Sequence, residues 1–281
     1  MQQIKIGSDS VPALGMGTWH MGEGGSAKTN QEIASLRYGL DHGLTVIDTA
    51  EMYGEGAAER VVGQAIKGRD RRQIYLISKF YPWHATAQLI RQSLAQSLVR
   101  LGTDYLDLYL LHWRGTTPLA ETIATLAQLQ QEGRIRAYGV SNFDTDDLAE
   151  ACNVPGGAGI VANEVLYNVA ARGIEYDLIP AQQQKGITLI GYSPYGSGDG
   201  RAIRVPAALQ GLAADKGITV HQLLLAWVLR SGNVLSIPKA SSIEHMQANI
   251  DAAAVQLTSA DCALIDQFFP APTLKVPLAE I

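Results

Sequence analysis

Short apolar runs alternate regularly along this chain with longer segments of helical periodicity. The apolar runs are rich in Val, Ile and Leu, as buried strands are, and most are followed by apolar residues spaced three and four positions apart. Such alternation predicts parallel strands joined by crossover helices. If LGMGTW, residues 14–19, is the first strand, the 281 residues hold eight strand–helix units.

The expected elements follow one another closely along the chain. After 14–19, strands are expected at residues 45–48, 74–78, 105–111, 135–140, 160–163, 187–191 and 234–237. Helices are expected at residues 30–42, 57–67, 87–101, 117–132, 145–152, 174–185, 207–216, 220–230, 242–251 and 258–268, the last opened by a capping box at Thr258 and Asp261. Residues 2–14 predict a hairpin, and Pro12 in its second arm argues against a place in the main sheet.

Eight units in a chain of this length fit a closed (β/α)8 barrel. We therefore expect the α/β class and one (β/α)8 TIM barrel domain over residues 1–281, with an N-terminal β-hairpin lid and a short, loosely ordered C-terminal tail from Pro270. An open doubly wound sheet is the alternative, but it would carry a glycine-rich phosphate-binding sequence after its first strand. The segment from Gly15 to His20 lacks the third glycine of that pattern.

Charge and composition exclude several classes of partner. The net charge is −5 and no Lys/Arg-rich run occurs, which argues against nucleic acid. The two cysteines, Cys152 and Cys262, have no partners at metal-ligand spacing, so neither a disulfide framework nor a metal site is expected. The N-terminus lacks the apolar core of a signal peptide, and the apolar stretch 223–229 is too short to span a bilayer. We expect a cytoplasmic protein with no membrane partner.

Polar side chains gather where the predicted strands end. In a (β/α)8 barrel the C-terminal strand ends meet on one face, where active sites lie. Strands commonly turn polar as they leave a core, but this alternative does not explain the types of residue found. They are Asp48, Lys79, His112, Ser141, Asn142, Asn163, Glu164, Tyr192, Ser193 and Lys239.

Four side chains near the early strand ends form a set suited to proton transfer: Asp48, Tyr53, Lys79 and His112. A tyrosine has an unperturbed pKa near 10, and the ammonium group of Lys79 would lower that pKa for Tyr53. Asp48 could hold Lys79 in an ion pair, and a neutral His112 could donate a hydrogen bond to a carbonyl oxygen. The set predicts a general acid that stabilises a developing alkoxide, and this chemistry requires a hydride source.

The sequence resembles the aldo-keto reductase family over nearly its whole length. The matching segments are LGMGTW, GLTVIDTAEMYG, YLISK, LDLYLLHW, GVSNF, NEVLYN, YSPYG and IPKASSIEHMQAN. Within the family it is most similar to bacterial reductases of the methylglyoxal or 2,5-diketogluconate type. The resemblance implies NADPH-dependent reduction of aldehydes and ketones, with NADH as an alternative cofactor.

The resemblance also implies a role for each site residue. Tyr53 would be the proton donor, Lys79 and Asp48 would set its pKa, and His112 would orient the carbonyl. Three groups of residues would bind the cofactor. Ser141, Asn142 and Tyr192 would contact the nicotinamide, Ser193, Tyr195 and Ser197 the pyrophosphate, and Lys239, Ser242 and Asn249 the adenosine end; Gly17, Thr18, Trp19, Asp48, Glu164 and His245 complete the expected cofactor site.

Two positions depart from the family pattern. The family usually has Gln where this chain has Glu164, and an ionised carboxylate can accept a hydrogen bond from the nicotinamide carboxamide but cannot donate one. We hypothesise that an ionised Glu164 favours the oxidised, cationic nicotinamide. At His245 many members have Arg, a better partner for the 2′-phosphate of NADPH, so the preference for NADPH would depend on Lys239 with help from Ser242.

The expected substrate pocket is walled by side chains at or just beyond the first four strands: Trp19, Met52, Trp83, His112 and Trp113. Packing in the core or under a loop is the alternative for any single tryptophan. The tail and the loop after His112 are short, so we expect an open, shallow pocket for small 2-oxoaldehydes, keto-sugars or other small carbonyls. The resemblance implies a monomer, although no feature of the sequence decides the oligomeric state.

Two other functions are compatible with a barrel. A phosphosugar enzyme would use an anion site near strands seven and eight, where Ser197, Gly198 and Gly200 lie, but it leaves the four-residue set unexplained. A non-catalytic sensor or regulatory subunit could bind a nicotinamide nucleotide on the same barrel. The intact set of Asp48, Tyr53, Lys79 and His112 argues against this second alternative.

Overall fold

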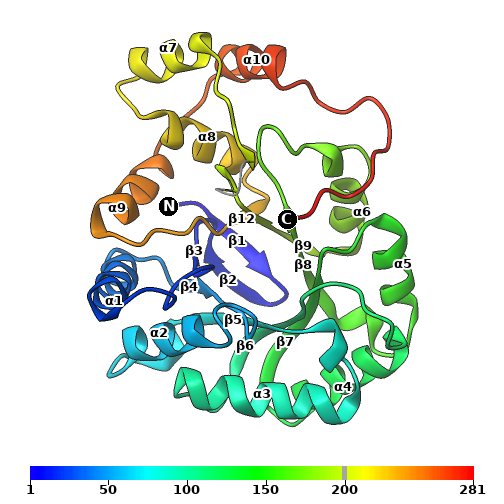
Figure 1. Ribbon diagram of the computed structural model, residues 1–281. Helices are drawn as coiled ribbons and strands as arrows, with labels where there is room; N and C mark the ends of the chain where they lie inside the picture. Colours follow the sequence, from blue (N-terminus) through cyan, green and yellow to red (C-terminus); the bar gives the residue numbers. More distant parts are fainter. Residues whose placement is uncertain (198–200) are drawn as a thin grey trace.

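The computed structural model describes residues 1–197 and 201–281, and it has eight parallel strands surrounded by helices (Figure 1). Neighbouring strands pair in the order β12-β9-β8-β7-β6-β5-β4-β3. Backbone bridges from Leu14 to Ser236 and from Gly17 to Lys239 join the two ends of this order. The predicted (β/α)8 barrel is therefore confirmed.

The strands lie close to their predicted positions. They are β3 (Met16–Gly17), β4 (Val46–Asp48), β5 (Tyr75–Phe80), β6 (Leu106–Leu111), β7 (Ile135–Ser141), β8 (Ile160–Leu166), β9 (Thr188–Tyr192) and β12 (Val234–Ser236). Every residue of β5 and β6 is buried, because these strands face the barrel interior on one side and helices on the other. This double burial explains why the strands appear in the sequence as continuous apolar runs.

The helices are α1 (Ser26–Asp41), α2 (Ala57–Ile66), α3 (Ala87–Leu101), α4 (Leu119–Gln131), α5 (Thr145–Asn153), α6 (Leu178–Lys185), α7 (Ala207–Asp215), α8 (Val220–Leu229), α9 (Ile243–Ala252) and α10 (Ser259–Phe268). The capping box predicted for the last helix is present, with reciprocal bonds between Thr258 and Asp261. Helix α1 begins four residues before the predicted start at Asn30. Helix α6 begins later than Ile174, which lies in a separate 3-10 turn.

The first barrel strand is much shorter than LGMGTW suggested. At the seam where the barrel closes, its backbone passes close to the segment that follows β12. A Cβ atom at Gly17 would lie 2.4 Å from the carbonyl oxygen of Ile237, so only glycine fits there. A second small hairpin, β10 (Gly196–Ser197) with β11 (Arg201–Ala202), was not predicted.

The N-terminal hairpin, β1 (Gln3–Ile6) and β2 (Asp9–Pro12), lies outside the barrel sheet as expected. Its contacts are with the first residues of barrel strands. The Thr188 hydroxyl donates to the Lys5 carbonyl (2.5 Å), and Asp9 pairs with Arg136 at 2.9 Å. The hairpin therefore covers the N-terminal ends of the strands, opposite the ends that carry the predicted site.

The C-terminal tail corrects one expectation. It contains no helix or strand, yet it is held against the barrel rather than loosely ordered. Lys275 pairs with Asp146 on α5 at 3.1 Å, and Leu278 packs against the hydrophobic core. The last residue, Ile281, lines the cavity described below, so the tail forms part of the site.

Within the described ranges, no helix combines the length and the apolar character needed to cross a membrane.

Candidate active site

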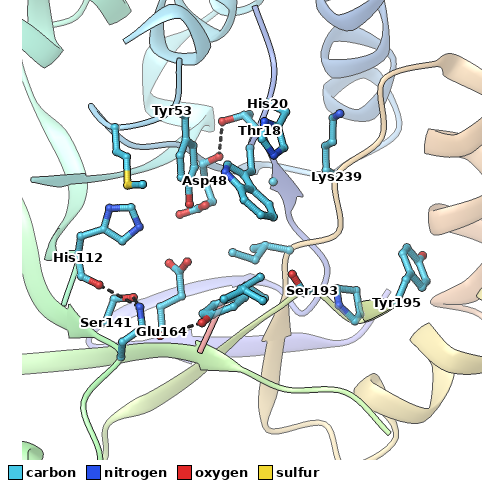
Figure 2. Close-up of a pocket in the computed structure, with 18 of the residues that line it drawn as sticks. Thr18, His20, Asp48, Tyr53, His112, Ser141, Glu164, Ser193, Tyr195 and Lys239 are labelled. Carbon is cyan, nitrogen blue, oxygen red and sulfur yellow. Dashed lines mark hydrogen bonds between the residues drawn. The ribbon is translucent and has the colours of Figure 1, made fainter. Parts of the chain in front are cut away.

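The C-terminal ends of the strands surround a cavity of about 390 Å³ (Figure 2). Most of the polar strand-end residues singled out in the sequence line it, although they come from six different barrel strands. Two do not: Asn163 is fully buried and holds the Phe143 carbonyl at 2.9 Å, and Lys79 lies beneath the cavity floor. The lining residues used below are Gly17, Thr18, Trp19, His20, Asp48, Met52, Tyr53, His112, Trp113, Ser141, Asn142, Glu164, Tyr192, Ser193, Tyr195, Lys239 and Ile281.

Lys79 is the centre of the predicted set. Its side chain is fully buried, and its ammonium group donates to both Asp48 carboxylate oxygens at 2.7 and 2.8 Å. It also donates to the Thr49 carbonyl at 3.2 Å and to the Tyr53 hydroxyl oxygen at 3.1 Å. Burial acts to lower the pKa of Lys79, but the carboxylates of Asp48 and Glu164 outweigh it and hold that pKa well above its usual value. Lys79 is therefore a permanent cation beneath the cavity.

Tyr53 presents its phenol from the turn after β4. Its oxygen accepts from Lys79, so its own proton is free to be donated into the cavity. The expectation that Lys79 would leave this tyrosine with a lowered pKa is wrong for the structure as it stands. The Lys79 ammonium favours the phenolate and so acts to lower the pKa of Tyr53. Burial raises that pKa by more than Lys79 lowers it. The neutral phenol is thus the resting form, as a proton donor requires.

His112 follows β6 and faces Tyr53 edge to face, with 5.7 Å between ring centroids. Burial and the neighbouring Lys79 ammonium lower the pKa of His112 well below its ordinary value, so the imidazole is neutral. Neither ring nitrogen has a hydrogen-bond partner within the described part of the chain, and Nδ1 is buried. A neutral imidazole can donate one N–H to a carbonyl oxygen in the cavity.

The residues expected to contact the nicotinamide lie side by side. Ser141 on β7 pairs in register with Glu164 on β8, and the backbone N–H of Asn142 donates to the backbone carbonyl of Glu164 at 2.8 Å. The Tyr192 hydroxyl donates to the Asn142 side chain at 2.8 Å, which fixes the tyrosine ring along the cavity wall. These contacts form a polar rim next to the four-residue set.

The opposite end of the cavity holds the other expected cofactor residues. Tyr195 donates to Asn249 on α9 at 2.6 Å, which ties the loop after β9 to that helix. Ser242 caps α9 by accepting from the His245 backbone, and the His245 side chain is exposed. Ser197 lies in β10, but its side chain is outside the described part of the structure, as are residues 198–200, on which the anion-site alternative depends.

Lys239 has neighbours that the sequence did not suggest. Partial burial and the Lys28 ammonium lower its pKa, while the carboxylates of Glu32 and Glu23 act the other way. Glu32 is fully buried and accepts from the Gly22 backbone at 2.9 Å, and its second oxygen is unpartnered within the described part of the chain. Lys28 was missed because it lies on α1 before the predicted helix start at Asn30.

The aromatic wall is only partly as expected. Trp19, Met52 and Trp113 line the cavity, as predicted. Trp83 does not: it is 59% exposed and stacks on Tyr81, with 4.3 Å between ring centroids. Its 3-10 turn directs it to the outer surface of the rim, where its edge meets Trp113.

Left-handed backbone conformations concentrate at the cavity. His20, Asn142 and Ser193 have φ values of 63°, 56° and 51°, which L-residues other than glycine rarely adopt. All three line the cavity. Such strain is typical of functional sites, and a residue's type gives little signal of it in the sequence. Among the described residues, no group of three or more His, Cys, Asp and Glu side chains is placed to hold a metal ion.

A phenol, a buried ammonium, a carboxylate and a neutral imidazole at the C-terminal end of a (β/α)8 barrel are the arrangement expected of a carbonyl oxidoreductase. Comparison with known proteins agrees. A model of the aldo/keto reductase family matches residues 13–269, and the chain belongs to this family.

Its relatives include the methylglyoxal reductase YeaE of Escherichia coli, 45% identical over 99% of both chains. An NADH-specific methylglyoxal reductase of Escherichia coli is 30% identical over 94% of this chain and 97% of its own. A crystal structure of an aldo-keto reductase from Klebsiella pneumoniae in complex with NADPH superposes with a TM-score of 0.95, at 47% identity, covering 100% of this chain and 99% of that chain.

Proposed function

We propose that this chain uses NADPH to reduce small 2-oxoaldehydes such as methylglyoxal, with Tyr53 as the proton donor. The observation that carries the proposal is the contact of Lys79 with both Asp48 and Tyr53 beneath a cavity that also holds a neutral His112. The family supplies the reaction class, and relatives named as methylglyoxal reductases supply the substrate class.

The described residues fit a nicotinamide nucleotide. The cavity extends from Tyr53 to Lys239, with the polar rim at one end and the Lys239 ammonium at the other. Ser141, Asn142, Glu164 and Tyr192 would hold the nicotinamide, while Lys239 and Lys28 would attract the 2′-phosphate. The bound cofactor supplies a hydride.

The chain's own residues handle the carbonyl oxygen. His112 donates a hydrogen bond that orients it, and Tyr53 gives its proton as negative charge develops there. Lys79 stabilises the phenolate that remains, because its ammonium already contacts the phenol oxygen at 3.1 Å. Asp48 holds Lys79 in place through two short hydrogen bonds. Proton transfer from a positioned group of this kind accelerates a reaction by ~10²–10⁴-fold.

The direct test is NADPH oxidation followed by absorbance, with methylglyoxal, a keto-sugar and a simple aldehyde as substrates. We expect turnover with methylglyoxal, and NADH assayed in parallel ranks the two cofactors. Tight binding of NADPH without turnover of any carbonyl would instead support the sensor alternative.

Lys239→Met should weaken NADPH binding by about 10- to 100-fold, the effect of losing one charge-assisted contact. NADH lacks the 2′-phosphate, so its dissociation constant should change by less than about threefold. Fluorescence titration of both nucleotides measures this. Lys67→Met, at an exposed position after α2, is the matched control and should leave both dissociation constants unchanged. Equal weakening of NADPH and NADH in Lys239→Met would contradict the assignment.

Trp113→Ala should raise the KM for methylglyoxal by about tenfold, because the loss removes apolar surface from the cavity wall. Trp83→Ala is the control, since its ring lies on the outer rim and should leave KM within about twofold. Steady-state kinetics at saturating NADPH distinguishes the two. A larger increase of KM in Trp83→Ala than in Trp113→Ala would indicate that Trp83 contacts the substrate.

A further inference from the structure

Glu164 has a buried carboxyl group that the four-residue set does not use. The residue lies on β8, its side chain is 2% exposed, and Oε2 has no hydrogen-bond partner within the described part of the chain. Figure 2 shows the carboxyl group directed into the cavity, on the side facing Asp48. A polar group so placed is available to a ligand.

Two carboxyl groups here share one cation. Lys79 has three N–H groups, and they serve Asp48, the Thr49 carbonyl and the Tyr53 hydroxyl. Glu164 Oε1 lies 3.2 Å from the Lys79 nitrogen, a longer contact than either of those between Lys79 and Asp48, and Oε2 has no hydrogen-bond partner within the described part of the chain. Two buried carboxylates that share one cation are destabilised, and such a pair takes up a proton. Asp48 receives both short ammonium contacts, so Glu164 is the member of the pair that takes up the proton more readily.

We propose that Glu164 senses the redox state of the nicotinamide through its own protonation. As a neutral acid it holds the carboxamide in the way a glutamine would, and as a carboxylate it favours the oxidised, positively charged ring. This inference rests on the proposed nucleotide binding. It also revises the hypothesis that Glu164 is ionised throughout, because the neutral acid can donate a hydrogen bond as Gln does.

Glu164 titrates together with Asp48, because burial raises the pKa of both carboxyl groups, and this pair is separable from the other ionisable neighbours. Burial and the Asp48 carboxylate raise the pKa of Glu164 to about 8. Burial raises the pKa values of Tyr53 and Tyr192 above their usual values. Burial and the Lys79 ammonium lower the pKa of His112 well below its usual value. Titratable groups from several elements face Glu164: Asp48 from β4, Tyr53 from the following turn, Lys79 from β5, His112 after β6 and Tyr192 from β9. The tail residue Glu280 also raises the pKa of Tyr192. On the β7 side, Ser141 and Asn142 are uncharged.

The experiment compares dissociation constants of NADPH and NADP⁺ from about pH 6.5 to about pH 9.5, where the Asp48–Glu164 pair loses its shared proton. The ratio of the NADPH constant to the NADP⁺ constant cancels effects of Lys239 and of the 2′-phosphate, which both nucleotides share. We expect this ratio to rise about tenfold with pH in the wild type, the change equivalent to one pKa unit.

In Glu164→Gln the ratio should not change with pH and should match the wild-type value at the acidic end. Glu150→Gln is the matched control, because Glu150 is exposed on α5 and pairs with Arg114. The control should keep the wild-type pH dependence. Infrared difference spectra of the nucleotide-free protein give a second readout: a protonated-carboxyl band should be present in the wild type, absent in Glu164→Gln, and lost at alkaline pH.

The outcomes separate the two proposals. Binding of both nucleotides with a ratio that does not depend on pH, or with the same dependence in Glu164→Gln, would overturn the role of Glu164 alone. Failure of either nucleotide to bind would overturn the proposed function and this inference with it. Absence of the protonated-carboxyl band at acidic pH would also overturn the inference.

Discussion

Tyr53→Phe is expected to lower kcat for methylglyoxal reduction by at least ~100-fold, the scale of losing a general acid. The phenol oxygen is the one acceptor of Lys79 that reaches the cavity with a proton to give, and phenylalanine keeps the ring while removing that proton. His112 and the cavity wall remain, so NADPH should bind with a dissociation constant within about threefold of wild type. Single-turnover kinetics, with binding measured separately, isolates the chemical step.

Tyr75→Phe is the matched control for that experiment. Tyr75 is buried at the start of β5, and its hydroxyl has no hydrogen-bond partner within the described part of the chain. The control removes a buried phenol oxygen at the other end of the same strand that carries Lys79. A comparable loss of kcat in both variants, or an unchanged kcat in Tyr53→Phe, would show that Tyr53 is not the proton donor.

Lys79→Met should abolish detectable turnover and lower the free energy of unfolding by about 3–5 kcal/mol near neutral pH, the usual cost of leaving a buried charge unpaired. The side chain is fully buried between Asp48 and Glu164, so no solvent can replace its charge. Urea unfolding measures the stability. Lys67→Met, at an exposed position after α2, is the control and should change stability by less than about 0.5 kcal/mol.

The loss in Lys79→Met should depend on pH, and its sign follows from the two carboxyl groups. Without the ammonium, both native pKa values lie above the unfolded values of about 3.9 and 4.3. The native state then binds more protons than the unfolded state, so its stability falls as pH rises from these values through the native pKa values. The deficit relative to wild type should be smallest near about pH 5 and larger near about pH 8.

Adding Asp48→Asn and Glu164→Gln to Lys79→Met tests the cause directly. The triple variant has no buried charge left at this place, so most of the pH-dependent deficit should disappear. A deficit that is the same at both pH values, or that persists in the triple variant, would indicate lost packing of the lysine stem rather than unpaired carboxylates.

The barrel and the four-residue set follow from the order of residues along the chain. Alternation of apolar runs and helical segments fixes parallel strands, and parallel strands bring their C-terminal ends to one face. Asp48, Lys79 and His112 each follow such a run directly, so their meeting could be predicted from strand order alone. The hairpin was placed outside the sheet by Pro12, and the capping box at Thr258 set the start of the last helix.

The protonation states and the cavity rim depend on contacts between segments far apart in the chain. The number of ammonium N–H groups available to Glu164 depends on the directions of the Lys79 contacts, which no spacing encodes. Burial raises the pKa of Tyr53 against the effect of Lys79, and burial is a property of the folded assembly. Trp83 meets Trp113 on the outer rim, and Ile281 lines the cavity from the far end of the chain, so local sequence does not set either placement. Local sequence fixes which groups reach the strand ends, whereas the surrounding chain sets their charge and access.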